Sequence, residues 1–157
     1  MSAAIITKFY TSFQRKDYRG MQACYHPDVE FSDSMFPSLK GKKAKAMWHM
    51  LLAAGTDLAV TFNDVVANEK EGRCHWEAAY TFSLTGRKVL NKIDARFKFK
   101  DGLIIRHQDS FDFWRWSRMA MGPTGTLLGW LSPFKQKVRK SIGQRLEKFI
   151  EKNPEYS

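Results

Sequence analysis

Residues 93–114 read IDARFKFKDGLIIRHQDSFDFW, two runs of alternating apolar and polar residues on either side of the turn KDG. Alternation with a period of two is typical of half-buried strands, and a glycine-containing turn between two such runs predicts a β-hairpin. We expect a three-residue loop with Gly102 in the left-handed conformation, because this register separates apolar from charged side chains. The facing pairs are then Phe99–Leu103, Phe97–Ile105, Ala95–His107 and Ile93–Asp109. The apolar face of the hairpin therefore carries both His107 and Asp109.

The same alternation extends toward the N-terminus over residues 58–68, 73–83 and 88–99, with the turns KEG and LTGR between the runs. This pattern predicts an antiparallel meander whose last strand covers residues 103–114. A two-residue turn at Thr85 and Gly86 gives the facing pairs Val89–Phe82, Asn91–Tyr80, Ile93–Ala78 and Ala95–Trp76. The inner face then combines large rings with a few polar groups: Trp76, Tyr80, Phe82, Asn91, Ile93, Phe97, His107, Asp109 and Phe111.

Helical periodicity marks the two ends of the chain. Apolar residues recur at helical spacing over residues 5–13 and 42–54, and Asp17 suits the N-cap of a short second helix that Pro27 ends. A short strand is expected over residues 29–33. Residues 118–133 form an apolar connector broken by Gly and Pro, and a helix with an apolar stripe follows from Phe134. The order predicts an α+β protein, with a domain over residues 1–116 and a connector plus C-terminal helix over residues 117–157.

The chain is basic, with 26 Lys and Arg residues against 16 Asp and Glu residues and a formal net charge of +10. Basic residues gather over residues 40–45 and 135–152, and such clusters can attract nucleic acid or anionic lipid. No nucleic-acid-binding motif accompanies them, so solvated helix faces are the preferred interpretation. Neither nucleic acid nor a membrane surface is therefore an expected partner. The C-terminal helix is expected to pack its stripe on the domain or on a dimer partner.

Cys24 and Cys74 are the only cysteines, which is too few for a disulfide scaffold, and neither has the company of other metal-ligating residues. Both are expected to be reduced core residues. The first residues do not read as a signal peptide, and no apolar run approaches the roughly 20 residues of a spanning helix. A cytoplasmic protein is expected.

Polar groups on the inner face of the predicted sheet suggest a site. An unpartnered buried carboxylate is unfavourable, so Asp109 should be paired, hydrated or shifted in pKa. One interpretation is that His107 and Asp109 simply bond each other near a strand end. The preferred one is a ligand cavity in which polar groups interrupt an aromatic wall.

Three stretches carry a family resemblance: FYTSFQRKDYRGMQACYHPDVEFSD (9–33), LKGKKAKAMWHML (39–51) and the hairpin at 93–114. Over about residues 4–116 the chain resembles the NTF2-like superfamily, and within it the SnoaL-like and ketosteroid-isomerase-like proteins. The resemblance implies a cone made by a strongly curved antiparallel sheet. N-terminal helices close the cone around a pocket, and the protein is usually a homodimer.

The resemblance also suggests roles for individual residues. Asp33 in VEFSD matches the position of the catalytic base of ketosteroid isomerases, whereas Ala95 stands where those enzymes keep a protonated aspartate as oxyanion donor. SnoaL-like cyclases use a His/Asp pair in the pocket, with an Asp on the late strands as acid/base, and the resemblance implies that role for Asp109, with His107 nearby on the same face. Epoxide-hydrolase relatives use an Asp-Arg-Asp set, but Asp94 and Arg96 are expected to face away from the pocket.

The leading hypothesis is proton transfer, by an isomerase or cyclase, on an apolar ligand that bears a carbonyl group. Asp109 is the first choice as catalytic base and Asp33 the second, with His107 orienting the base or sharing its proton. Tyr80 or Asn91 would donate to a developing oxyanion. Five rings are expected to shape the cavity: Trp48, Trp76, Phe82, Phe97 and Phe111. No metal or organic cofactor is expected. The alternative is a non-catalytic ligand-binding or scaffold module with the same fold.

Overall fold

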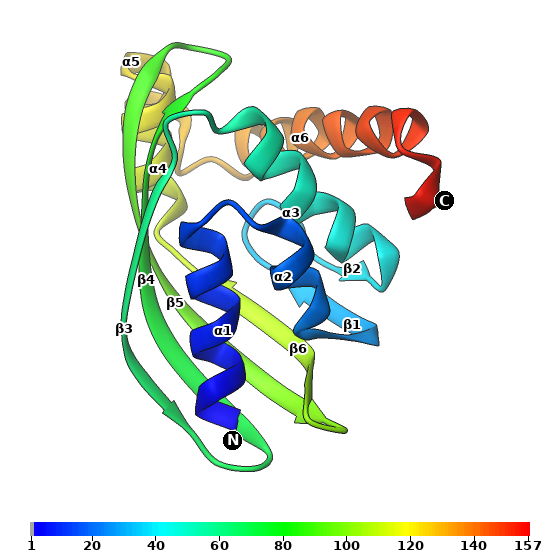
Figure 1. Ribbon diagram of the computed structural model, residues 1–157. Helices are drawn as coiled ribbons and strands as arrows, with labels where there is room; N and C mark the ends of the chain where they lie inside the picture. Colours follow the sequence, from blue (N-terminus) through cyan, green and yellow to red (C-terminus); the bar gives the residue numbers. More distant parts are fainter. Residues whose placement is uncertain (1) are drawn as a thin grey trace.

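The computed structural model describes residues 2–157, which form helices, then a long meander, then helices again (Figure 1). The first half contains α1 (Ser2–Gln14), α2 (Tyr18–Ala23), β1 (Tyr25–Ser32), β2 (Leu39–Lys40) and α3 (Lys42–Ala54). The meander consists of β3 (Ala59–Ala67), β4 (Glu71–Phe82), β5 (Arg87–Lys100) and β6 (Leu103–Ser110). The C-terminal part contains α4 (Phe113–Met121), α5 (Pro123–Leu128), α6 (Ser132–Lys152) and a 3-10 turn (Pro154–Tyr156).

The strands form one six-stranded sheet in the order β2-β1-β6-β5-β4-β3. All neighbouring strands are antiparallel except β1 and β6, which run parallel, so the sheet departs at this one pair from the antiparallel expectation. The sheet is strongly curved, and α1, α2 and α3 lie against its concave side (Figure 1). The α+β architecture predicted from the sequence is confirmed.

The hairpin between β5 and β6 keeps the predicted faces but not the predicted register. Asp101 and Gly102 both have positive φ, so the turn has two central residues, the usual solution for a tight hairpin. An irregularity between Lys98 and Phe99 then absorbs one residue of β6. The observed pairs Phe97–His107 and Ala95–Asp109 are shifted by two residues from the prediction. The predicted three-residue loop was therefore wrong. A two-residue turn alone would place His107 and Asp109 on the outer face, and the extra residue in β6 puts them on the inner face as predicted.

The hairpin between β4 and β5 differs from its prediction in the same way. Phe82 pairs with Arg87, so four residues form the turn where two were expected. The observed pairs Tyr80–Val89, Ala78–Asn91 and Trp76–Ile93 are again shifted by two residues. A shift of two preserves which side chains share a face, so the inner face has the predicted composition.

The N-terminal elements follow their local signals with one exception. The Asp17 carboxylate accepts a hydrogen bond from the backbone N–H of Gly20, which confirms it as the N-cap of α2, and α3 has the predicted bounds. However, Pro27 does not end the helix. It lies inside β1, which begins at Tyr25. The pairing of β1 with β6 is irregular between Tyr25 and Glu30, which accommodates a residue without a backbone N–H.

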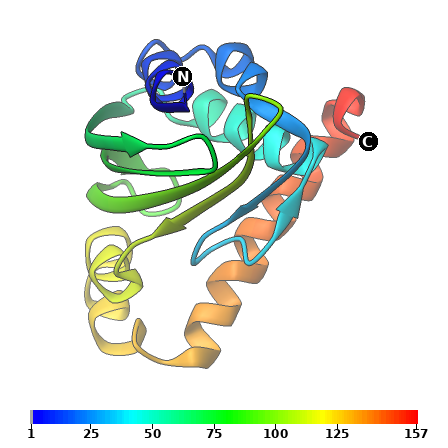
Figure 2. The ribbon, with the colours of Figure 1, turned by 90° about the horizontal axis from the view of Figure 1, so that it is seen from below.

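The segment predicted as a connector over 118–133 is largely helical. Asp112 caps α4 by accepting a hydrogen bond from the backbone N–H of Arg115, so the strand ends earlier than expected. Gly122 has φ of 63° and separates α4 from α5. In Figure 2 the short helices α4 and α5 lie together, and α6 runs away from them. The glycines and prolines of this segment therefore mark the ends of short helices.

The contact between α4 and α5 depends on a glycine, which gives a first prediction. A Cβ at Gly125 would overlap the backbone carbonyl of the buried Ser117. We therefore expect Gly125→Ala to lower the free energy of unfolding by roughly 1–3 kcal/mol, measured by urea denaturation. Gly143, within α6, has open space around its Cα and is the matched control, for which alanine should stabilise by roughly 0.5–1 kcal/mol. Equal effects at the two positions would contradict the close contact.

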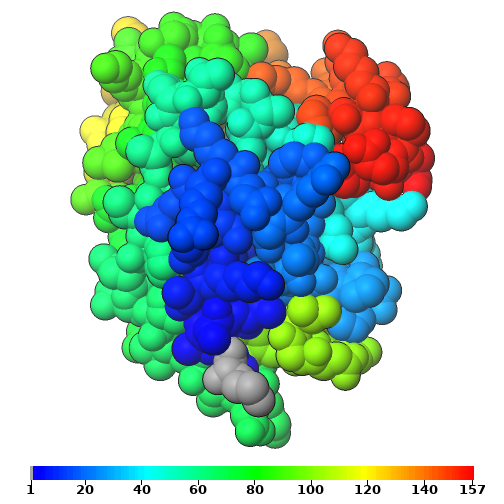
Figure 3. Space-filling view, viewed as in Figure 1, coloured from blue at the N-terminus to red at the C-terminus, as the bar shows by residue number. Residues whose placement is uncertain are grey.

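The core lies between the concave side of the sheet and the helices that cover it. The outer surface of these N-terminal helices is coloured blue and cyan in Figure 3. Cys24 and Cys74 are buried free thiols, as predicted. The apolar stripe of α6 buries Val138, Leu146 and Ile150. Among the helices over residues 2–157, none combines the length and apolar character that a bilayer crossing requires.

Candidate functional site

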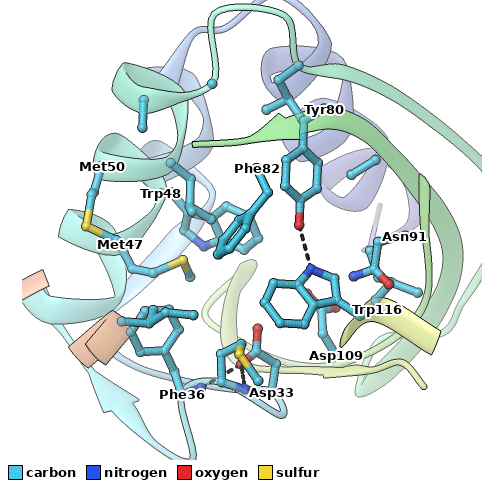
Figure 4. A pocket seen from close by; sticks show the side chains of 18 of the residues that line it. Asp33, Phe36, Met47, Trp48, Met50, Tyr80, Phe82, Asn91, Asp109 and Trp116 are labelled. Carbon is cyan, nitrogen blue, oxygen red and sulfur yellow. Dashed lines mark hydrogen bonds between the residues drawn. The ribbon is translucent and has the colours of Figure 1, made fainter. Parts of the chain in front are cut away.

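A cavity of about 190 Å³ lies inside the curved sheet (Figure 4). Its wall is mostly apolar and comes from α3, the inner faces of β4 and β5, and the C-terminal helices α4 and α6. Among the polar side chains that reach it are Asp33, Tyr80, Asn91, Asp109 and Arg145. A few polar groups converging on a largely apolar cavity are typical of a small-molecule site.

Asp109 is held at one end of this cavity by two donors. Its Oδ1 lies 2.8 Å from Nε2 of His107 and accepts a hydrogen bond from Nε1 of Trp76 at 3.3 Å. The carboxyl group is almost fully buried, yet it forms part of the cavity wall. Because both bonds go to Oδ1, the second oxygen is available to a bound molecule.

Hydrogen bonds behind His107 hold its ring in place. Trp48 Nε1 donates to the hydroxyl oxygen of Tyr25 at 2.7 Å, and that hydroxyl lies 2.8 Å from Nδ1 of His107. An indole N–H can only donate, so the Tyr25 hydroxyl accepts from Trp48 and keeps its own proton to donate. Trp48, Tyr25 and His107 thus form a buried chain of hydrogen bonds that ends at Asp109 and orients its carboxyl group.

Asp33 reaches the same part of the site from just beyond the end of β1 (Figure 4). Its Oδ1 accepts hydrogen bonds from the backbone N–H groups of Met35 and Phe36, both at 2.7 Å, and thereby shapes the turn that follows the strand (Figure 4). Burial raises the pKa of Asp33 to about 7 against the lowering effect of the Phe36 N–H, and the negative charge of Asp109 raises it further. Asp33 therefore changes ionisation near neutral pH.

Both carboxyl groups also border a second, more polar and open hollow on the other side of the site. Ser34, Gln108 and Arg139 contribute to its wall, and the Arg139 guanidinium donates through Nε to the backbone oxygen of Ser34 at 2.6 Å. Asp33 and Asp109 thus lie between an apolar cavity and a polar route to solvent. Such a position allows a carboxyl group to exchange its proton with water.

Tyr80 and Asn91 project into the cavity from neighbouring strands (Figure 4). The indole Nε1 of Trp116 donates to the Tyr80 hydroxyl oxygen at 2.8 Å, which leaves the hydroxyl proton free to be donated in turn. Burial raises the pKa of Tyr80, and the charge of nearby Asp33 adds to this effect. Tyr80 is therefore a neutral hydrogen-bond donor under ordinary conditions.

The structure brings most of the predicted site residues to the cavity. Asp33 and Asp109 contribute to its wall, as do Tyr80, Asn91, Trp48, Trp76, Phe82 and Phe111. His107 and Phe97 are fully buried behind that wall, so His107 reaches a ligand only through Asp109. Asp94 lies on the outer face of the sheet, bonded to His75, and Arg96 is exposed.

Sequence reasoning missed three contributors. Tyr25 was read as a helix end, and nothing in its local pattern indicates a contact with His107, 82 residues away. Trp116 comes from α4, in a region that was predicted as the end of the domain without a helix, and Arg145 comes from the C-terminal helix, which was assigned to a separate segment.

Comparison of the fold with solved structures finds similar proteins at low sequence identity. A protein with a ketosteroid isomerase-like fold from Catenulispora acidiphila is 10% identical with a TM-score of 0.66, covering 76% of this chain and 93% of that chain. An LEH-like epoxide hydrolase of M. tuberculosis is 15% identical with a TM-score of 0.64, covering 81% and 94%. A Xanthomonas campestris pv. campestris protein, provisionally assigned as a polyketide cyclase, is 19% identical with a TM-score of 0.63, covering 75% and 95%.

The sequence comparisons agree with the fold. No curated protein gives a significant match. The SnoaL-like domain family matches residues 6–107, a range that runs from α1 into β6 and ends at His107. Asp109, Trp116 and Arg145 of the site lie beyond that range. Because the match covers well over half of the chain, this protein belongs to the SnoaL-like family within the NTF2-like fold.

Proposed function

We propose that this chain binds an apolar small molecule bearing a carbonyl group and moves a proton on it by acid–base catalysis. One observation carries the proposal: two carboxyl groups border the same cavity in different surroundings. His107 and Trp76 hold Oδ1 of Asp109 and leave its second oxygen open to a ligand. Burial raises the pKa of Asp33 to about 7, so this group can give or take a proton near neutral pH. Two carboxyl groups at one cavity can serve as base and acid in the same reaction.

The proposed step moves one proton in each direction. The free oxygen of Asp109 removes a proton from the carbon next to the ligand carbonyl, and the electron pair of the broken C–H bond forms the double bond of an enol. Neutral Asp33 gives its proton to the carbonyl oxygen, while Tyr80 or Asn91 donates a hydrogen bond there. In an isomerisation, Asp109 delivers its proton to another carbon of a conjugated enol while Asp33 takes back the enol O–H proton. In a cyclisation, the enol carbon attacks a second carbonyl, whose oxygen takes the proton from Asp109 as the enol O–H proton returns to Asp33.

The same fold carries unrelated reactions, so the choice among them depends on the site. An Asp-Arg-Asp set like that of the epoxide hydrolases is not favoured, because Asp94 and Arg96 lie on the outer face of the sheet. His107 acts as a positioning residue in this proposal, since it touches Asp109 and not the cavity.

A general assay for proton removal tests the proposal without knowledge of the product. Ketones, lactones and diketones are first screened for thermal stabilisation of the protein, and the ligands that bind are incubated in D₂O. Proton NMR then follows deuterium incorporation next to the carbonyl. We expect Asp109→Asn to slow this exchange at least ~100-fold, the usual scale of general base catalysis, while the ligand-induced thermal shift persists.

The matched control is Asp94→Asn, an exposed aspartate on the outer face of the sheet, which should leave exchange unchanged. Exchange that survives Asp109→Asn would refute Asp109 as the base. Ligand binding without wild-type exchange would identify the chain as a non-catalytic binding module.

A further inference from the structure

The tip formed by α5 and the turn into α6 exposes apolar side chains to an unusual degree. Leu127 is 70% exposed, Trp130 71% and Leu128 40%. This tip, residues 123–131, lies at the edge of the molecule in both ribbon views (Figures 1 and 2). Exposed apolar residues are ordinary when scattered, but a group of this size concentrated on one projection indicates a contact surface.

The sequence on both sides of this tip is basic and lacks acidic residues. Residues 113–146 contain no Asp or Glu and include Arg115, Arg118, Lys135, Lys137, Arg139, Lys140 and Arg145. One of these charges is linked to the tip through Trp114: the Arg118 guanidinium lies 4.2 Å from the ring centre of Trp114, whose indole N–H donates to the backbone oxygen of Thr126.

The charge pattern selects the partner. A symmetric contact between two copies would bring two such positive segments together, which is unfavourable. A nucleic acid would complement the charge but would not use the exposed Leu127 and Trp130. An anionic bilayer complements both features, because Trp and Leu enter its interface while Lys and Arg remain near the headgroups. We propose that residues 123–131 dock on an anionic membrane surface.

The same geometry connects the proposed docking surface to the cavity. The β4–β5 turn touches α4 near the tip, since the Thr85 hydroxyl donates to the backbone oxygen of Ala120. The adjoining Ser83 forms part of the cavity wall and accepts a hydrogen bond from Arg145 at 3.1 Å. When the protein is docked on the membrane, this rim of the cavity would therefore lie near the bilayer, where apolar ligands concentrate.

Vesicle co-sedimentation tests this inference with the full chain. Wild-type protein should bind vesicles of phosphatidylglycerol and phosphatidylcholine but not vesicles of phosphatidylcholine alone, and added salt should weaken the binding. The double variant Leu127→Ser/Trp130→Ser should bind at least ~10-fold more weakly, because it removes the inserting side chains. The control Val66→Ser/Leu90→Ser alters exposed apolar residues elsewhere, at 53% and 42% exposure, and should bind as wild type.

A fluorescence measurement covers the case in which the double variant folds poorly. Lipids brominated near the headgroup should quench wild-type tryptophan emission, and Trp130→Phe, which keeps an apolar ring, should bind but lose most of this quenching. Binding unaffected by the double variant would overturn the inference. Failure of the wild-type protein to bind anionic vesicles would also overturn it. In that case, binding to duplex DNA would indicate a nucleic-acid surface, and a dimer that becomes a monomer in the double variant would indicate a subunit contact.

Discussion

At pH 8 the Asp33→Asn variant should be more stable than the wild-type protein. Burial raises the pKa of the Asp33 carboxyl to about 7, whereas an aspartate in the unfolded chain titrates near 3.9. Folding at pH 8 therefore either forces a proton onto Asp33 or buries its charge, and both oppose folding. An asparagine is neutral at every pH and keeps the oxygen that accepts hydrogen bonds from Met35 and Phe36.

The expected difference follows from linkage. Because the pKa of Asp33 is higher in the folded state, its stabilising contribution is fully present below about pH 4 and is lost as the pH rises through 7. A difference of about three pKa units corresponds to roughly 4 kcal/mol. Asp33 also borders the polar hollow, where water partly solvates its charge, so we expect an advantage of roughly 2–4 kcal/mol for the variant above pH 7.

Urea denaturation between pH 4 and pH 8, followed by tryptophan fluorescence, measures this difference. The two proteins should have similar stability near pH 4 and diverge up to about pH 7. Asp57→Asn is the opposite control. Hydrogen bonds from the Thr81 hydroxyl and backbone N–H to the Asp57 carboxylate lower its pKa, so its loss should destabilise the protein at neutral pH. A wild-type protein more stable than Asp33→Asn at pH 8 would mean that Asp33 is ionised and favourably paired.

The faces of the sheet could be predicted from the sequence, but its registers could not. Side chains alternate with a period of two, so any two-residue shift leaves the same residues on the same face. Both hairpins are shifted in this way, and the inner face still has the predicted composition. The shift is set by the conformation of the turns, for example by the positive φ of Asp101. The alternation of apolar and polar residues carries no information about that conformation.

The candidate site was predictable to the extent that it depends on this alternation. His107 and Asp109 are two residues apart on one strand, so their shared face follows from the period, and they are in fact hydrogen-bonded. The placement of His107 behind the wall does not follow, because it depends on Tyr25 and Trp48 from distant elements. The role of α4 was also hidden, although Asp112 at its start was a readable capping signal.

The buried hydrogen bonds behind Asp109 give the second large effect, in the comparison of Tyr25→Phe with Tyr10→Phe. Both tyrosines are almost completely buried and both rings pack against Phe9. Each substitution removes a single oxygen atom. The Tyr25 hydroxyl bonds both Trp48 and His107, whereas the Tyr10 hydroxyl has no hydrogen-bond partner within residues 2–157.

We expect Tyr25→Phe to lower the free energy of unfolding by roughly 2–6 kcal/mol, because it leaves a buried nitrogen on Trp48 and another on His107 without a partner, at about 1–3 kcal/mol each. Tyr10→Phe should be neutral or stabilising by up to about 1 kcal/mol, since it removes a buried hydroxyl that has no partner. Urea denaturation of the two variants measures the difference. Equal destabilisation would show that Tyr25 contributes only its ring.

The same pair distinguishes a structural role from a positioning role in catalysis. Without the Tyr25 hydroxyl, Nδ1 of His107 loses its hydrogen-bond partner, and the ring is held less firmly against Asp109. In the proposed reaction the base would then be poorly oriented toward the ligand. The deuterium-exchange rate of Tyr25→Phe at saturating ligand should therefore fall while KM changes little, and Tyr10→Phe should keep the wild-type rate. A lower stability with an unchanged rate at saturating ligand would limit Tyr25 to holding the core together.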